Sequence, residues 1–349
     1  MIRKKQLICN TFLLTGVSLL MSCIGIAFQT WLVGRIGSAG IGLYQLVISV
    51  TNLLATFAIS GIRFASTRLI SEELGGTDCT GIRAAMRRCL GYGLMFGLLA
   101  GAVLWALAEP IGFLWIGDAR TVRSLRISAI SMPCISLCAS LSGYFTACGR
   151  VWKPSAVHLV EQVFGIGAVW LCLSRVPLTD IELSCAAVTT GRVMADVASL
   201  IMMAGIYLSD RRRHYASCGG GAHLTARMLK IAVPLAVSAY ARSALTTLQN
   251  LLVPRGLKAA GYSANGALAG YGTIQGMVLP IIFFPSCIMS ALGELIVPEL
   301  TEAQVQGSRD EIHAATRRLI TLSLQFSAAV GLFMWIFSDM LGIAVYKSG

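Results

Sequence analysis

The chain has 349 residues, of which 56% are hydrophobic and only 13% charged, and its mean hydropathy is +0.73. Soluble domains carry about 25% charged residues, so this composition excludes an ordinary soluble protein and favours a membrane protein. The formal net charge of +12 resides in short segments between apolar runs, without the interleaved aromatic residues of nucleic-acid binders. We therefore expect the basic residues to set orientation in a membrane, and no nucleic-acid partner.

The basic N-terminal segment MIRKKQLICNTFLLTGVSLL resembles a signal peptide. Its apolar run continues to Val33 without a small-x-small cleavage site, and further apolar runs follow at once. We therefore interpret it as the first membrane span. When its basic end is placed in the cytoplasm, the inside segments hold about twice as many Lys and Arg residues as the outside segments, which favours a cytoplasmic N-terminus.

Long apolar runs recur along the chain, and they are too uniform for the alternating strands of a barrel. About 20 apolar residues can cross a bilayer as a helix, and hydrocarbon requires each backbone amide to be bonded within that helix. The predicted fold class is therefore all-α integral membrane, with about nine transmembrane helices. The predicted spans are 7–33, 42–66, 89–108, 127–148, 155–174, 183–208, 228–253, 266–297 and 316–338.

Two features divide the later part of the chain. Residues 210–227 are basic and then Gly-rich, which predicts a flexible cytoplasmic linker between an N-terminal six-helix lobe, 1–209, and a C-terminal part, 228–349. The eighth span is overlong and contains Pro280 and Pro285, which we interpret as hinges, with simple kinks as the alternative.

A repeat relates the two parts. Segments 82–105 (IRAAMRRCLGYGLMFGLLAGAVLW) and 312–335 (IHAATRRLITLSLQFSAAVGLFMW) agree at nine of 24 positions with an offset of 230, including the Arg-Arg pair. Further back the offset becomes 220, and QTWLVGR, residues 29–35, pairs with QNLLVPR, residues 249–255. Spans seven to nine are thus predicted to be a second copy of spans one to three. Because six spans separate the copies, the repeats are parallel.

The second copy ends at Gly349, at the position equivalent to the loop after the third span. We therefore expect the C-terminal lobe, 228–349, to hold only the first three helices of a truncated six-helix unit.

Two stretches carry a family resemblance. GSAGIGLYQLVISVTNLLATFAISGIRFASTRLISEELGG, residues 37–76, and WKPSAVHLVEQVFGIG, residues 152–167, resemble stage V sporulation protein B-like flippases of polysaccharide biosynthesis. This group belongs to the multidrug/oligosaccharidyl-lipid/polysaccharide (MOP) exporter superfamily. The resemblance implies two parallel six-helix lobes, as in multidrug exporters and lipid II flippases.

The same resemblance implies a multi-pass protein of the bacterial cytoplasmic membrane. It would translocate undecaprenyl-linked oligosaccharide or peptidoglycan precursor by alternating access, with membrane lipids, this lipid-linked saccharide and cell-wall synthesis proteins as partners. The alternative is a cation-coupled multidrug exporter of the same fold, which favours an acidic cavity in the first lobe. The first three predicted spans contain no acidic residue.

Polar residues inside spans are candidates for lining the substrate cavity, since charges there are costly and usually face water or a partner. Arg242 lies deepest, and is either a cavity cation or the partner of an acidic group. Arg63 could contact substrate or extend to the interface. Glu294 falls one position from the repeat counterpart of Arg63, so the two would form either a gate or a permanent ion pair. Gln29 and Gln249, which the repeat pairs, could line the cavity or bond between helices.

A second set of charges lies within the N-terminal lobe. Arg192 and Asp196 are four residues apart on one helix and are expected to neutralise each other. Glu161 could pair with Arg192 or take up a coupling proton. His158 lies three residues before Glu161 on the same face, and we interpret it as a structural histidine.

The sequence offers no pattern for an enzyme or a cofactor. The eleven cysteines include no CxxC motif and no zinc spacing with histidine, so neither a metal site nor a disulfide is expected. Ser-His-Asp, paired-carboxylate and HExxH arrangements are absent from the sequence. A membrane enzyme of lipid or sugar transfer would need a cluster of acidic or His residues at one interface, and a purely structural scaffold would not need charges at mid-membrane.

Overall fold

The computed structural model describes residues 2–75, 82–177, 180–214, 224–286, 289 and 309–346. Helices form all of the regular structure in this part of the chain, as apolar runs in hydrocarbon require. The helices are α1 (Ile2–Ile59), α2 (Ile62–Gly75), α3 (Ile82–Ala106), α4 (Ala108–Pro110), the π-helix η2 (Ile111–Ile116), α5 (Thr121–Ala129), α6 (Ser131–Ala147), α7 (Trp152–Leu173), α8 (Ile181–His214), α9 (Leu224–Ala259), α10 (Ala264–Thr273), the π-helix η3 (Ile274–Val278), α11 (Leu279–Phe283), α13 (Arg309–Ile336) and α14 (Ser338–Tyr346).

The described residues contain seven helices long and apolar enough to cross a membrane, or eight if the pair α5 and α6, bent by 42°, is one span. One of the seven, Leu20–Glu73, has 54 residues and contains the predicted span 42–66 and residues 20–33 of the first predicted span. At 1.5 Å per residue, 54 residues are enough to cross a hydrocarbon core of about 30 Å twice, and the kink at Gly37 divides them into two helices. Each of the nine predicted spans therefore lies on helix, the eighth as far as the structure describes it.

Three residues with positive φ interrupt the long N-terminal segment. Gly37 has φ 71° and ψ 170° within α1, and Ser60 and Gly61, with φ 44° and 72°, separate α1 from α2. A Cβ on Gly61 would lie 2.5 Å from the carbonyl oxygen of Ala232, so both the backbone angle and the close contact with α9 require glycine there. The predicted span 42–66 is thus a broken helix.

The contacts divide the chain into two compact units, Ser38–Gly272 on one side and Met1–Gly37 with Thr273–Gly349 on the other. This division follows packing, whereas the predicted lobes 1–209 and 228–349 follow the repeat, and those lobe boundaries stay a prediction. The ends of the predicted linker are helical, because α8 continues to His214 and α9 begins at Leu224.

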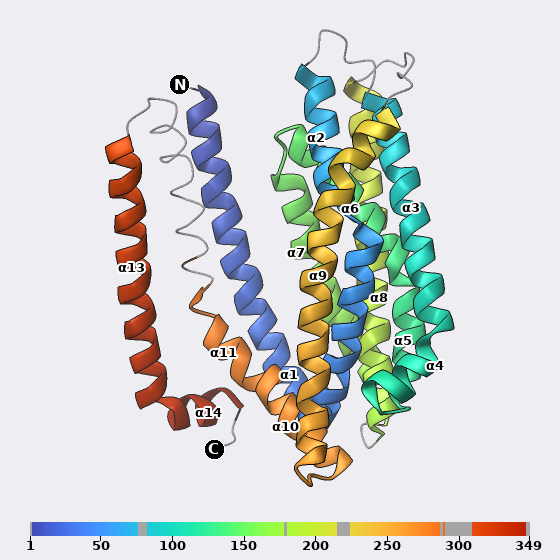
Figure 1. Ribbon diagram of the computed structural model, residues 1–349, viewed down its shortest axis with the longest axis vertical. Coiled ribbons are helices and arrows are strands. Elements are labelled where there is room, and N and C mark those ends of the chain that lie inside the picture. Colours follow the sequence, from blue (N-terminus) through green and yellow to red (C-terminus); the bar gives the residue numbers. More distant parts are fainter. Residues whose placement is uncertain are drawn as a thin grey trace. The chain divides into compact units, whose positions relative to one another are not determined.

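The unit 38–272 is a helical bundle in which α2, α3 and α6 to α9 run alongside the second half of α1 (Figure 1). Small residues allow the closest approaches, as is usual between membrane helices. At Gly191 of α8, an added Cβ would lie 2.6 Å from the backbone nitrogen of Val169 on α7. The bundle thus depends on backbone-to-backbone packing as well as on side-chain packing.

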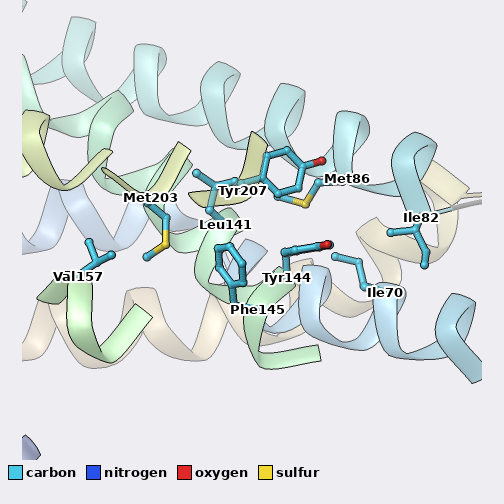
Figure 2. Packing of buried hydrophobic residues seen from close by; sticks show 9 residues of the cluster. All are labelled: Ile70, Ile82, Met86, Leu141, Tyr144, Phe145, Val157, Met203 and Tyr207. Carbon is cyan, nitrogen blue, oxygen red and sulfur yellow. The ribbon is translucent and has the colours of Figure 1, made fainter. Parts of the chain in front are cut away.

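One end of this unit has an aromatic core, which Figure 2 shows from close by. Tyr144 packs edge-on against Phe145 and Tyr207, with ring centroids 5.1 and 5.0 Å apart. The other members of the cluster are aliphatic or Met side chains from α2, α3, α6, α7 and α8: Ile70, Ile82, Met86, Leu141, Val157 and Met203. Edge-to-face aromatic pairs add to the stability gained from burial, so this end is firmly packed.

Element boundaries repeat with the offset that the sequence predicts. Helix α3 ends at Ala106 and α13 ends at Ile336, 230 residues later. The pair α4 and η2 covers 108–116, and α14 covers 338–346, which is the same interval 230 residues on. The second copy therefore reproduces the helix ends of the first as well as its residues.

The other unit can be described by itself. In it, Phe28 and Trp31 stack with centroids 5.9 Å apart, and the guanidinium of Arg35 lies over the Trp31 ring. The π-helix η3 leads directly into α11, with Pro280 in its first turn. Pro280 lacks the N–H that a helix interior would need, so it is tolerated at this start. Pro285 lies in the turn after α11.

Candidate functional site

Helix α9 carries a stripe of exposed polar side chains, Ser238, Arg242, Thr246 and Gln249, which we call the α9 stripe. The spacing of four, four and three residues keeps them on one helix face. No acidic side chain among the described residues pairs with Arg242, and the Thr246 hydroxyl donates to the Arg242 carbonyl at 3.0 Å. The two predicted residues Arg242 and Gln249 thus lie on the same face of a helix long and apolar enough to span a membrane.

A second face of α9 also carries polar side chains, and these form hydrogen bonds with the second half of α1. The Thr247 hydroxyl donates to the Ser49 carbonyl at 3.2 Å, and the Asn250 amide donates to the Ser49 hydroxyl at 3.0 Å. About one helix turn before Thr247 on α9, the hydroxyl of Ser243 accepts a hydrogen bond from the Thr56 hydroxyl at 3.2 Å. These bonds hold α9 against α1 and orient the stripe away from it.

The seam between α1 and α9 ends at the break in the second span. The Ser60 hydroxyl lies 2.6 Å from that of Tyr240 and 3.0 Å from that of Tyr92 on α3. Beyond this point, Met228 and Ala232 of α9 pack into a buried cluster with α2 and α3. Sequence reasoning missed this hydroxyl cluster, because its members lie 32 and 180 residues apart in the sequence.

The other predicted cavity residues are placed as follows. Arg63 is exposed on the first turn of α2, just after the break. Gln29 is half-buried in the other unit, and its Nε2 has no hydrogen-bond partner among the residues that the structure describes. Glu294 lies outside the described residues, so the predicted gate between Arg63 and Glu294 stays a prediction.

The predicted charge set gathers between α7 and α8. Arg192 lies 3.6 Å from the carboxylate of Asp196 on its own helix and 3.7 Å from that of Glu161 on α7. The Nδ1 atom of His158 lies 3.2 Å from the other oxygen of Glu161. The Glu161 and Asp196 side chains are 14% and 10% exposed, whereas Arg192 is 62% exposed. One arginine therefore bridges two largely buried carboxylates, an arrangement that could serve structure or proton uptake.

A third group of charges, which sequence reasoning missed, centres on Asp210 near the end of α8. Its buried carboxylate accepts hydrogen bonds from the Tyr144 hydroxyl and the Lys153 ammonium, each at 2.9 Å, and pairs with Arg150. The only signal in the sequence is one acidic residue at the head of the basic run DRRRH.

At the opposite end of the unit, an arginine joins α9 to η2, and a second arginine pairs with an aspartate in the following loop. Arg255 of α9 donates to the carbonyls of Leu114 and Trp115, at 2.6 and 2.5 Å, where η2 ends. Between the spans, Asp118 accepts from Arg120 at 2.6 Å. Burial by itself would raise the pKa of Asp118, but hydrogen bonds and charge from Arg120 outweigh it and hold that pKa below the ordinary 3.8.

Comparisons with known proteins agree with this architecture. Residues 14–171 match the MatE family model. The chain is 21% identical over 350 residues to stage V sporulation protein B of Bacillus subtilis, in an alignment that covers 99% of this chain and 68% of that protein. It is 31% identical over 117 residues to multidrug resistance protein PmpM of Pseudomonas aeruginosa, covering 32% of this chain and 23% of that protein.

A solved structure shows the same fold. The inward-facing form of a multidrug resistance MATE family transporter of the MOP superfamily aligns with a TM-score of 0.66 and 15% identity, covering 94% of this chain and 72% of that one. The chain therefore carries a MatE-like region over residues 14–171 and shares the fold of a MOP superfamily transporter. Along nearly its whole length its sequence is similar to stage V sporulation protein B. The predicted fold class and the predicted resemblance to stage V sporulation protein B-like proteins are confirmed.

Proposed function

We propose that the protein is a flippase that translocates undecaprenyl-linked oligosaccharide or peptidoglycan precursor across the bacterial cytoplasmic membrane by alternating access, with its N-terminus in the cytoplasm. Its similarity to stage V sporulation protein B along nearly the whole chain supports this choice. Membrane lipids, the lipid-linked saccharide and cell-wall synthesis proteins are the proposed partners.

The α9 stripe is the observation that carries the proposal. An arginine exposed in the middle of a membrane-spanning helix is costly in lipid, and such residues usually face a water-filled path. A lipid-linked saccharide presents an anionic diphosphate and a large polar head. A guanidinium donates paired hydrogen bonds to phosphate, and the hydroxyl and amide groups of Ser238, Thr246 and Gln249 suit a sugar.

The remaining predicted residues take supporting roles in this scheme. Arg63, with Glu294, is proposed as a gate, and Gln29 as the counterpart of Gln249 in the other copy. Pro280 and Pro285 are proposed hinges, because a proline at a helix start and one in the following turn leave few backbone bonds to break on bending. Glu161, Arg192 and Asp196 are proposed to couple transport to protons or to hold α7 against α8.

A cation-coupled multidrug exporter is the second candidate, favoured by the similarity to PmpM over 117 residues. The charge that the α9 stripe exposes is positive, however, and a positive charge repels a drug cation at close range. An anionic lipid-linked substrate fits the stripe better.

The test is translocation of a fluorescent lipid-linked precursor by the protein in vesicles. We expect Arg242→Ala to reduce the rate at least tenfold and Arg242→Lys to retain part of it, because lysine keeps the charge without the paired donors. Arg175→Gln, which changes an exposed arginine in a loop, is the matched control. Efflux of a drug cation with no movement of the precursor would select the second candidate.

A further inference from the structure

A hollow of about 540 Å³ opens at the end of the bundle where α7 begins and α8 ends. Its lining includes Arg150, Trp152 and Lys153 from one side and Ser209 and Asp210 from the other. It is lined by residues of a single unit, and none of them belongs to the α9 stripe or to the charge set around Arg192.

The hollow has an excess of positive charge. Asp210 is 5% exposed and faces two cations, the ammonium of Lys153 at 2.9 Å and the guanidinium of Arg150. One carboxylate cannot neutralise two cations, so a net charge of about +1 remains at the wall. Arg150 is 35% exposed and so can reach a ligand in the hollow.

An exposed tryptophan at the hollow is typical of the headgroup level of a membrane. Trp152 is the first residue of α7 and is 55% exposed, and tryptophan in membrane proteins concentrates at the interface between headgroups and hydrocarbon. Two turns further along α7, Val160 and Phe164 are exposed, as are Ile201 and Leu208 on α8. An apolar surface therefore continues from the hollow along both helices, as acyl chains require.

We propose that this hollow binds the phosphate group of an anionic membrane phospholipid. Arg150 and Lys153 donate to the phosphate, Ser209 and Trp152 line the rim, and the acyl chains lie on the exposed apolar residues of α7 and α8. A basic pocket between membrane helices is the kind of site that retains anionic headgroups. Asp210 orients the two cations and competes with the phosphate for them.

Binding of phosphatidylglycerol to the purified protein, with phosphatidylcholine as the neutral comparison, tests the proposal without any transport assay. Lys153→Gln should weaken phosphatidylglycerol binding about fivefold, the effect of about 1 kcal/mol per basic residue. Asp210→Asn should strengthen it, because the competing charge is lost while the amide oxygen still accepts from Tyr144. Arg123→Gln, at an exposed arginine of the hollow at the other end of the unit, should change nothing.

The opposite signs of the two variants separate a lipid site from a merely structural cluster. If Lys153→Gln and Asp210→Asn both lower the melting temperature and neither alters the preference for phosphatidylglycerol, the proposal is wrong. It is also wrong if inorganic pyrophosphate displaces the lipid at lower concentration than a free phospholipid does, since the site would then recognise a soluble diphosphate.

Discussion

The hydroxyl of Ser60 lies 2.6 Å from the hydroxyl of Tyr240, and this contact ties the break in the second span to α9. Ser60 has a positive φ, which is uncommon for a residue other than glycine. The strained backbone persists because neighbouring groups fix it, here Tyr240 and Tyr92, both bonded to the same hydroxyl. The break therefore belongs to the packed interface of the second and third spans with α9, the start of the predicted second copy.

A double-mutant cycle on Ser60→Ala and Tyr240→Phe should show coupling. Hydrogen bonds between membrane helices contribute about 0.6 kcal/mol on average, so we expect a coupling energy of about that size in the free energy of unfolding in mixed micelles. Tyr262→Phe, at a tyrosine that is 60% exposed, is the control. Strict additivity of the two changes would show that the contact contributes nothing.

Removing Arg192 should destabilise the N-terminal lobe more than removing a surface arginine. Arg192→Gln leaves Glu161 and Asp196, both largely buried, without their shared cation, and an uncompensated buried charge costs about 3–5 kcal/mol. The Arg126–Glu109 pair, whose side chains are 43% and 59% exposed, is the comparison, and Arg126→Gln should cost about 1 kcal/mol or less.

A second substitution should restore part of the stability that Arg192→Gln removes. Arg192→Gln combined with Asp196→Asn should recover part of the lost stability, because one of the two stranded carboxylates is then neutral. Equal losses for the single and the double variant would mean that Arg192 stabilises the helices by packing rather than by charge.

The sequence predicted the spans well because the signal is simple, a run of about 20 apolar residues. It could not predict the site around Asp210, which brings together residues 57 to 66 positions apart. In the sequence, Asp210 begins a polar segment that reads as a linker, whereas in the structure α8 continues to His214. Only packing of α8 against α6 and α7 turns this residue inward.

The break at Ser60 and Gly61 was hidden for a related reason. A serine-glycine pair is common inside membrane helices, where small residues aid packing. The glycine is required because the carbonyl of Ala232 comes close to Gly61. That contact exists only once α9 has packed against α2, so it cannot be read from the sequence around Gly61. The candidates Arg242 and Gln249, in contrast, could be chosen from the sequence alone, since a charge within an apolar run and a polar residue repeated between copies are both visible there.

Acid should weaken the loop that joins η2 to α5. The pKa of Asp118 is held below its ordinary value of 3.8, because the hydrogen bonds and charge of Arg120 outweigh the opposing effect of burial. A depressed folded pKa means that the stabilisation is complete above about 3.8 and is lost as the pH falls through the lower folded value.

Melting temperatures at pH 3 and pH 6 should therefore differ more for the native chain than for Asp118→Asn, which cannot titrate. Glu109→Gln is the control, since it removes a carboxylate whose pair with Arg126 is exposed to solvent. A pH dependence unchanged by Asp118→Asn would assign the acid sensitivity to other groups.

Two glycines on neighbouring helices should respond in opposite directions to the same substitution. A Cβ at Gly191 would lie 2.6 Å from a backbone nitrogen of Val169, so Gly191→Ala must push α8 away from α7. Overpacking of this kind costs about 1–3 kcal/mol. A Cβ at Gly167, on α7, has nothing within 4 Å, and replacing a mid-helix glycine by alanine stabilises by about 0.5–1 kcal/mol.

The free energies of unfolding of the two variants, measured under identical conditions, test this prediction. Because both changes add one methyl group to a helix of the same bundle, any general effect of the detergent cancels between them. If Gly191→Ala were as stable as Gly167→Ala, α7 and α8 would not be in backbone contact. Arg192 could then not bridge from α8 to Glu161, so this pair of variants also tests the geometry on which the charge set depends.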